Sequence, residues 1–231
     1  MKYGLHISTK GDLAGTPARA KAMGAQALQF FAGSPRTFSM PTYSDEVADA
    51  FKQATDDNNM PPYLHMMYLT AYGTPDTVLR RKSVDAAKQT MVNAEKLGIL
   101  GVVTHMGSHK GEGLEKVMPV LVESLKEVVE PVKSSKLLLE ISAGQGGSIG
   151  NSIEELAAIY EATGKDERIE FCLDTCHMLA GGYEVRTNEG WDEALDKFDK
   201  LIGLDKLPVI HLNDSMTDIG SNRDRHENIG K

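Results

Sequence analysis

The sequence has few cysteines and no long apolar run, and both shortages exclude classes of protein. Its 231 residues include two cysteines, Cys172 and Cys176, which are too few for a disulfide framework. A reducing compartment suits such a chain, and we expect both thiols to be small, buried, apolar side chains. Because no run of about 20 apolar residues is present, we expect no membrane span and no membrane partner.

The sequence also lacks a signal peptide and a dinucleotide-binding motif. The N-terminal segment M-K-Y-G-L-H-I-S has neither the long apolar stretch nor the small-residue cleavage site of a secretory signal. We therefore expect an intracellular, cytoplasmic protein. No G-x-G-x-x-G follows a predicted strand, which argues against a dinucleotide-binding domain.

Positive charge is scarce as well. The chain has 25 lysines and arginines against 33 aspartates and glutamates, which gives a formal net charge of −8. Nucleic-acid-binding proteins normally present a basic surface. Three bound divalent ions, however, would add +6, bring the net charge to −8 + 6 = −2, and place that positive charge in the site itself. The charge balance therefore leaves a nucleic-acid partner open.

The sequence does contain a regular alternation of short β-rich runs with longer helical patterns. With 41% hydrophobic and 25% charged residues, it has the composition of one globular domain over residues 1–231. The predicted strands are Tyr3–Ile7, Ala27–Phe31, Tyr63–Met66, Gly101–Thr104, Leu137–Ile141, Ile169–Leu173 and Val209–Leu212. The predicted helices are Asp12–Met23, Asp45–Asn58, Thr77–Leu97, Glu115–Val129, Ser152–Ala162 and Asp192–Ile202.

This alternation predicts parallel βαβ units, in either a (β/α)₈ barrel or a doubly wound sheet. The two folds differ in where polar residues at strand ends come to lie. Such residues occur at the C-terminal ends of five predicted strands: His65, His105, Glu140, Asp174 and His211. They would meet at one mouth in a barrel but spread along a row in an open sheet, so we favour the α/β TIM barrel.

These polar residues are of the types that bind metals. Imidazole and carboxylate hold zinc, and sometimes manganese or iron, in catalytic sites. A single histidine at a strand end is usually structural. Here, however, five of the seven histidines lie at strand ends or in the loops just after them: His65, His105, His177, His211 and His226. Glu140 closes an apolar strand, where a metal would remove the cost of burying its charge.

Two short motifs reinforce this hypothesis. Asp174 and His177 form D-x-x-H, and Asp224 and His226 form D-x-H. We expect neither of the two remaining histidines to be a ligand: His6 is a core residue or a neighbour of the ligands, and His109 orients a ligand. His6 lies on the first predicted strand, and His109 follows His105 by four residues.

Five segments together resemble one known family. They are Leu173–Tyr183 (L-D-T-C-H-M-L-A-G-G-Y), His211–Ser215 (H-L-N-D-S), Gly220–Gly230 (G-S-N-R-D-R-H-E-N-I-G), Glu140–Gly146 (E-I-S-A-G-Q-G) and His105–His109 (H-M-G-S-H). They are similar to segments of endonuclease IV, the zinc-dependent apurinic/apyrimidinic endonucleases of base-excision repair. The resemblance runs from Lys2 to Lys231 and implies a (β/α)₈ barrel with three zinc ions at its mouth.

The resemblance also implies a role for each candidate residue. His65, His105 and Glu140 match the ligands of one zinc ion. Glu140 also matches the catalytic carboxylate that bridges to a second ion, which Asp174 and His211 help to hold. The ligands of the third ion match His177, Asp224 and His226. Manganese is an alternative to zinc at one site.

The expected partner is double-stranded DNA that contains an abasic site. Arg36, Tyr68 and Leu69 match the loops that the family inserts into the duplex at the lesion. Such wedges unstack the helix and expose an extruded nucleotide. We expect the protein to act as a monomer, in association with the nucleoid.

The sequence departs from the family's pattern in one large feature. In the family a further glutamate on the last barrel strand completes the second zinc site, but this sequence ends at Lys231 without a matching residue. We therefore expect the last strand and helix to be missing, and we favour a fragment of a longer reading frame. Two other functions stay open, a sugar isomerase or epimerase on the same metal-bearing barrel, and an inactive fragment that binds abasic DNA without cutting it.

Overall fold

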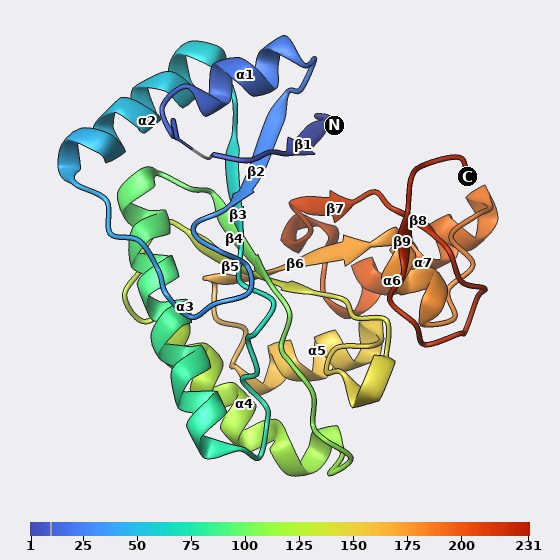
Figure 1. Cartoon of the computed structure of the whole chain (residues 1–231). Helices are drawn as coiled ribbons and strands as arrows, with labels where there is room; N and C mark the ends of the chain where they lie inside the picture. The colour runs from blue at the N-terminus through green and yellow to red at the C-terminus, as the bar shows by residue number, and fades with distance from the viewer. Residues whose placement is uncertain (10) are drawn as a thin grey trace.

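Seven parallel strands form one sheet in the computed structural model, which describes residues 1–9 and 11–231 (Figure 1). The strands are β1 (Gly4–His6), β2 (Ala27–Phe31), β3 (Pro62–His65), β4 (Gly101–Thr104), β5 (Lys136–Glu140), β6 (Ile169–Asp174) and β7 (Val209–His211). Each strand pairs in parallel with the next in sequence, so the order is β1-β2-β3-β4-β5-β6-β7. This sequential order is that of a TIM barrel, and it excludes the doubly wound sheet, whose strand order reverses at a switch point.

Helices form the outer layer of the barrel. They are α1 (Thr16–Ala22), α2 (Asp45–Asn58), α3 (Thr77–Leu97), α4 (Leu114–Val129), α5 (Ile153–Ala162) and α7 (Asn188–Leu201). From α1 to α5 each helix packs on the next, and α5 packs on α7. Figure 1 shows α1 to α4 following one another down one side of the sheet. In the described residues no helix is both long and apolar enough to cross a membrane.

Local sequence signals explain where these helices begin and end. Ser44 caps α2 by accepting a hydrogen bond from the backbone N–H of Val47, and Asp76 caps α3 in the same way. The predicted start of α1 at Asp12 is wrong. The Oδ1 atom of Asp12 accepts a hydrogen bond from the N–H of Gly15 at 2.8 Å, and this turn delays the helix until Thr16.

Several short elements were not predicted from the sequence. They are α6 (Thr175–Ala180), the 3₁₀ turns η1 (Gln145–Gly147) and η2 (Leu204–Lys206), and an antiparallel hairpin of β8 (Asp214–Ser215) and β9 (His226–Glu227). All are between two and six residues long, which is too short to show a hydrophobic period. The helix α6 and the hairpin carry residues of the candidate site.

The apolar core has two layers because strand side chains alternate between the faces of the sheet. Leu137 and Leu139 of β5 point outward into the large cluster between sheet and helices. Leu138 points inward and packs with Val103 and Cys172 inside the barrel. Each fully buried leucine stabilises the fold by about 1.5–3 kcal/mol, so the two layers together hold the strand ends in place.

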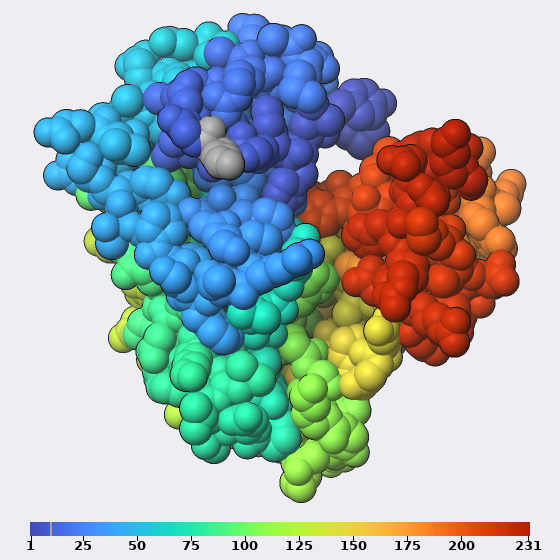
Figure 2. All heavy atoms as spheres, in the orientation of Figure 1, coloured from blue at the N-terminus to red at the C-terminus, as the bar shows by residue number. Residues whose placement is uncertain are grey.

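The barrel is open on one side in the described residues. In the part of the chain that the structure describes, β1 and β7 are the two edges of the sheet, and each pairs with one neighbour only. Apolar side chains along these edges are exposed, with Tyr3 at 66% and Leu212 at 64%. A cleft of about 1700 Å³ extends from the barrel mouth to this opening, where Figure 2 shows a hollow between the N-terminal and C-terminal parts of the surface. The prediction of a barrel without its last strand and helix is confirmed.

Candidate metal centre

Residues from five consecutive strands meet at the carboxyl mouth of the barrel. The strands β3, β5, β6 and β7 end on His65, Glu140, Asp174 and His211, and His105 directly follows β4. Glu140 lies at the centre and is 1% exposed. Its Oε2 atom lies 3.3 Å from Nε2 of His65 and 3.4 Å from Nε2 of His105, and its Oε1 atom lies 2.9 Å from Nδ1 of His211. The five polar residues that were expected to meet at the mouth, because each ends a strand, therefore do lie together.

The first group consists of His65, His105 and Glu140 and has the spacing of metal ligands. Within the described residues Glu140 Oε2 is a buried acceptor without a hydrogen-bond donor, which is a costly arrangement unless a cation occupies the space in front of it. Ligand atoms held tetrahedrally at ~2.0–2.1 Å from zinc lie ~3.3 Å apart. The observed separations of 3.3 and 3.4 Å match that value, so these residues fit a zinc ion.

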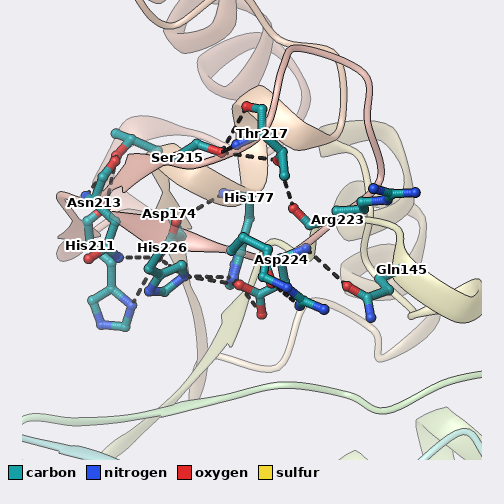
Figure 3. A network of polar contacts seen from close by, with 12 residues as sticks. Gln145, Asp174, His177, His211, Asn213, Ser215, Thr217, Arg223, Asp224 and His226 are labelled. Carbon is teal, nitrogen blue, oxygen red and sulfur yellow. Dashed lines mark hydrogen bonds and ion pairs between the residues drawn. The ribbon is translucent and has the colours of Figure 1, made fainter. Parts of the chain in front are cut away.

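The second group consists of His177, Asp224 and His226, which face one another in Figure 3. It lies beside the first group, because Nδ1 of His177 is 3.6 Å from Oε1 of Glu140. Nε2 of His177 is 3.3 Å from Oδ2 of Asp224, and Nε2 of His226 is 3.2 Å from Oδ1 of the same residue. The two imidazole nitrogens face each other at 3.3 Å. A divalent ion can accept both nitrogen lone pairs and neutralise the carboxylate, so this group also fits a metal.

Short local structures put the second group in place. Asp174 ends β6 and also caps α6, because its Oδ1 atom accepts a hydrogen bond from the backbone N–H of His177 at 3.0 Å. This cap turns His177 back towards the barrel mouth. The backbone N–H of Asp224 donates to Oε1 of Gln145 at 3.1 Å, and the β8–β9 hairpin carries His226.

The third group, Glu140, Asp174 and His211, lies between the other two. Nδ1 of His211 is 2.9 Å from Glu140 Oε1 and 3.9 Å from Asp174 Oδ2. Asn213 donates from Nδ2 to the same Asp174 oxygen at 2.6 Å and so fixes the carboxylate. Glu140 is thus shared between the first and third groups, one oxygen to each.

Both cysteines lie next to these groups, which was not predicted from the sequence. Cys172 lies with Glu140 and His211, and Cys176 lies with Asp224 and His226. Both are buried, as predicted. Burial raises the pKa of the Cys172 thiol to about 11 and also raises that of Cys176. Without a bound metal both thiols are therefore neutral at pH 7.

The charged side chains of the site shift one another's pKa values. Burial alone would raise the pKa of Glu140, but the charges of His105 and His211 outweigh it and keep that pKa well below its usual value. Burial lowers the pKa of His177, yet the hydrogen bond to Asp224 and the charge of Asp174 raise it to about 9. Glu140 is therefore ionised at neutral pH, as metal binding requires.

Comparison with known proteins identifies the family. The model of the Xylose isomerase-like TIM barrel family matches residues 17–231. A probable endonuclease 4 of Halothermothrix orenii is 40% identical over 100% of this chain and 84% of its own length. This chain belongs to the endonuclease IV family. The apurinic-apyrimidinic endonuclease of Caenorhabditis elegans is 37% identical over 99% of this chain and 59% of its own length. The crystal structure of endonuclease IV from Thermus thermophilus superimposes with a TM-score of 0.87, at 33% identity, over 98% of this chain and 81% of that one.

The residues that the endonuclease IV resemblance assigns to DNA lie on the rim of this mouth. Tyr68 is 56% exposed and Leu69 is 38% exposed, and both line the cleft with His65. The Tyr68 ring packs edge-on against His65 at a centroid distance of 5.7 Å. The backbone N–H of Tyr68 donates to the carbonyl of Pro35 at 2.9 Å, which joins its loop to the loop of the exposed Arg36. The two loops therefore form one surface beside the first group.

The two histidines left out of the endonuclease IV ligand set have other partners. His109 accepts hydrogen bonds at Nδ1 from the backbone N–H groups of Gly111 and Gly113, at 3.2 and 3.1 Å. His6 accepts one from Gln29. Sequence reasoning missed Gln145 and Asn213, which hold Asp224 and Asp174. Their only signal was their place within the segments Glu140–Gly146 and His211–Ser215.

Proposed function

We propose that this protein is a DNA-repair endonuclease that hydrolyses the phosphodiester bond 5′ to an abasic site in double-stranded DNA, with three zinc ions at the barrel mouth. The observation that carries the proposal is the sharing of one buried carboxylate, Glu140, between two groups of ligand type, with a third group beside them. Membership of the endonuclease IV family supports it. The barrel over residues 1–231 would act as a single monomeric domain.

Each group has a place in the reaction. His65, His105 and Glu140 would hold one ion, Glu140, Asp174 and His211 the second, and His177, Asp224 and His226 the third. Zinc ions, when bound, supply positive charge at the phosphate and lower the pKa of bound water to about 7. Glu140 fixes the distance between two groups because its two oxygens face them separately.

The reaction adds water to the phosphorus atom and breaks its bond to the 3′-oxygen on the 5′ side of the lesion. The products are a 3′-hydroxyl and a 5′-deoxyribose phosphate. We place the leaving oxygen at the group of His177, Asp224 and His226, where a positive charge would stabilise it. Tyr68 and Leu69 would enter the duplex at the abasic site, where little stacking has to be broken.

A second candidate is binding of abasic DNA without cleavage. The open edge between β1 and β7 favours it. His211 of the third group lies at the end of the edge strand β7, so this group has barrel residues on one side only and would hold its ion less firmly than the other two. A sugar isomerase is a weaker candidate. It needs one or two metals, whereas here Asp224 and His226 complete a further group.

The proposal is tested with a labelled duplex that carries one abasic site, beside an intact duplex of the same sequence. We expect a single incision with a 3′-hydroxyl end, loss of incision after chelation, and its return with zinc. Metal content by elemental analysis should be close to three per chain. Three ions with tight binding but no incision would replace the proposal with binding alone, and one ion would favour the isomerase.

A further inference from the structure

A glutamine in the middle of strand β2 connects two histidines inside the barrel. Gln29 lies opposite His6 of β1 in the sheet register, and its side chain reaches into the barrel. Its Oε1 atom lies 3.1 Å from Nε2 of His211, and its Nε2 atom lies 3.1 Å from Nδ1 of His6. Gln29 and His211 are 182 residues apart in sequence, so the barrel alone brings them together.

The histidines of the site are oriented in two different ways. His65 and His177 each direct Nδ1 at a backbone carbonyl, of Met66 at 2.7 Å and of Ile141 at 2.8 Å. Their Nε2 atoms are then turned to the carboxylates. His211 is reversed, since its Nδ1 atom faces Glu140. Its Nε2 atom therefore needs an acceptor from elsewhere, and a side chain provides it.

We propose that Gln29 is a positioning residue that sets the ring of His211 for metal binding. This inference rests on the proposed metal-dependent function. A histidine binds a metal through a nitrogen without a proton, so Nδ1 of His211 must be free of one and Nε2 must carry it. An Nε2–H donor needs an acceptor, and Gln29 Oε1 lies within hydrogen-bond distance.

His6 explains why the Gln29 amide keeps this orientation. An amide has one oxygen that accepts and one nitrogen that donates, and its orientation is assigned from the surrounding hydrogen bonds. With Nε2 of Gln29 directed at His6 Nδ1, the donor has an acceptor and Oε1 is left for His211. With the amide reversed, the Gln29 nitrogen would donate to Nε2 of His211. His211 would then carry its proton on Nδ1, which is the nitrogen that must be free to bind the metal.

Three variants separate this role from a structural one. Gln29→Leu removes the acceptor, whereas Gln29→Glu keeps it as a carboxylate. Gln26→Leu is the control. Gln26 lies just before β2 and accepts from the backbone N–H of Tyr3, just before β1, at 3.2 Å, and among the described residues it has no hydrogen bond to the site. We expect Gln29→Leu to weaken zinc binding at one site by about 10–100-fold, as loss of a partner of a metal ligand typically does. Gln29→Glu and Gln26→Leu should stay within a few-fold of wild type.

Two measurements decide the question. Competition with a chelator gives the zinc affinities, and ¹⁵N NMR of the zinc-saturated full chain gives the solvent exchange of the His211 Nε2–H proton. That proton should be protected in wild type and Gln29→Glu and should exchange rapidly in Gln29→Leu, with unchanged circular dichroism. Equal exchange in wild type and Gln29→Leu overturns the inference, as does equal zinc affinity. Because neither measurement reads DNA incision, a failure of the proposed reaction leaves this result distinguishable.

Discussion

Alanine substitutions at Gly107 and Gly111 should show how closely the loop after β4 packs on the loop that contains Ala71. Gly107 has φ +84° and lies between His105 and His109, and an added Cβ would lie 2.5 Å from the Cα of Ala71. Gly111 has φ +85°, and an added Cβ there would meet nothing within 4 Å. The variants Gly107→Ala and Gly111→Ala therefore share the backbone strain and differ in the clash.

The expected loss of stability has two contributions, the backbone strain and the clash. A left-handed backbone costs an alanine about 1–2 kcal/mol, and this applies to both variants. Forcing an extra carbon into a packed site costs about 1–3 kcal/mol more, and this applies to Gly107→Ala alone. The free energy of unfolding should fall by about 2–5 kcal/mol in Gly107→Ala and by about 1–2 kcal/mol in Gly111→Ala. For a chain of this size, Tm falls by about 2–4 °C per kcal/mol.

The clash should also reach the metal site. Thr70 donates from its hydroxyl to the carbonyl of His105 at 2.9 Å, and the backbone N–H of Tyr72 donates to the carbonyl of Met106 at 3.0 Å. Pushing the two loops apart therefore moves His105, and zinc affinity should fall in Gly107→Ala but not in Gly111→Ala. Thermal unfolding and chelator competition measure the two effects. An equal loss of Tm in both variants would refute the reasoning.

Three further predictions concern the site itself. Glu140→Gln should lower incision by about 10²–10³-fold, as loss of one key electrostatic contact does, and should reduce metal content; near-normal turnover would contradict its bridging role. Asp224→Asn should release one ion per chain by elemental analysis and leave two, whereas loss of all three would mean that the groups fill together. In metal-free protein the pKa of His177 is raised from 6.5 to about 9, so its stabilising charge is complete below pH 6.5 and lost as the pH rises through 9. The Tm of chelator-treated protein should therefore fall over that range, and in His177→Gln it should fall less.

The barrel could be predicted from the sequence because long, periodic helices alternate regularly with short apolar strands. The ranges predicted for β2, β4, α2 and α3 agree with the structure to the residue. The polar ends of five strands then predicted the mouth of the barrel, since parallel strands in a closed sheet end on one side. This argument brought Glu140 and His211 together although they lie 71 residues apart.

The parts that could not be predicted depend on tertiary contacts. The helix α6 has six residues and forms where Asp174 caps it, and the β8–β9 hairpin pairs two residues with two. Gln29 is a polar residue in the otherwise apolar run Ala27–Phe31, which was a signal, but its partner lies 182 residues away and no local rule identifies it. Periodicity predicts elements, whereas these contacts arise only after the barrel has formed.

The acidic balance of the chain predicts that the proposed DNA binding depends on metal. Without metal, the three proposed ligand carboxylates, Glu140, Asp174 and Asp224, outnumber the histidines whose pKa is raised, His177 and His211, so the mouth is negative and repels a phosphate. Metal-bound histidines are neutral, so with three divalent ions the charge of this group would be −3 + 6 = +3. We therefore expect metal-free protein to bind an abasic duplex much more weakly than zinc-loaded protein, with the difference shrinking at high salt, as fluorescence anisotropy would measure. Equal binding would instead assign phosphate recognition to exposed basic residues of the rim such as Arg36 and Arg225, and the ions would then serve the chemical step alone.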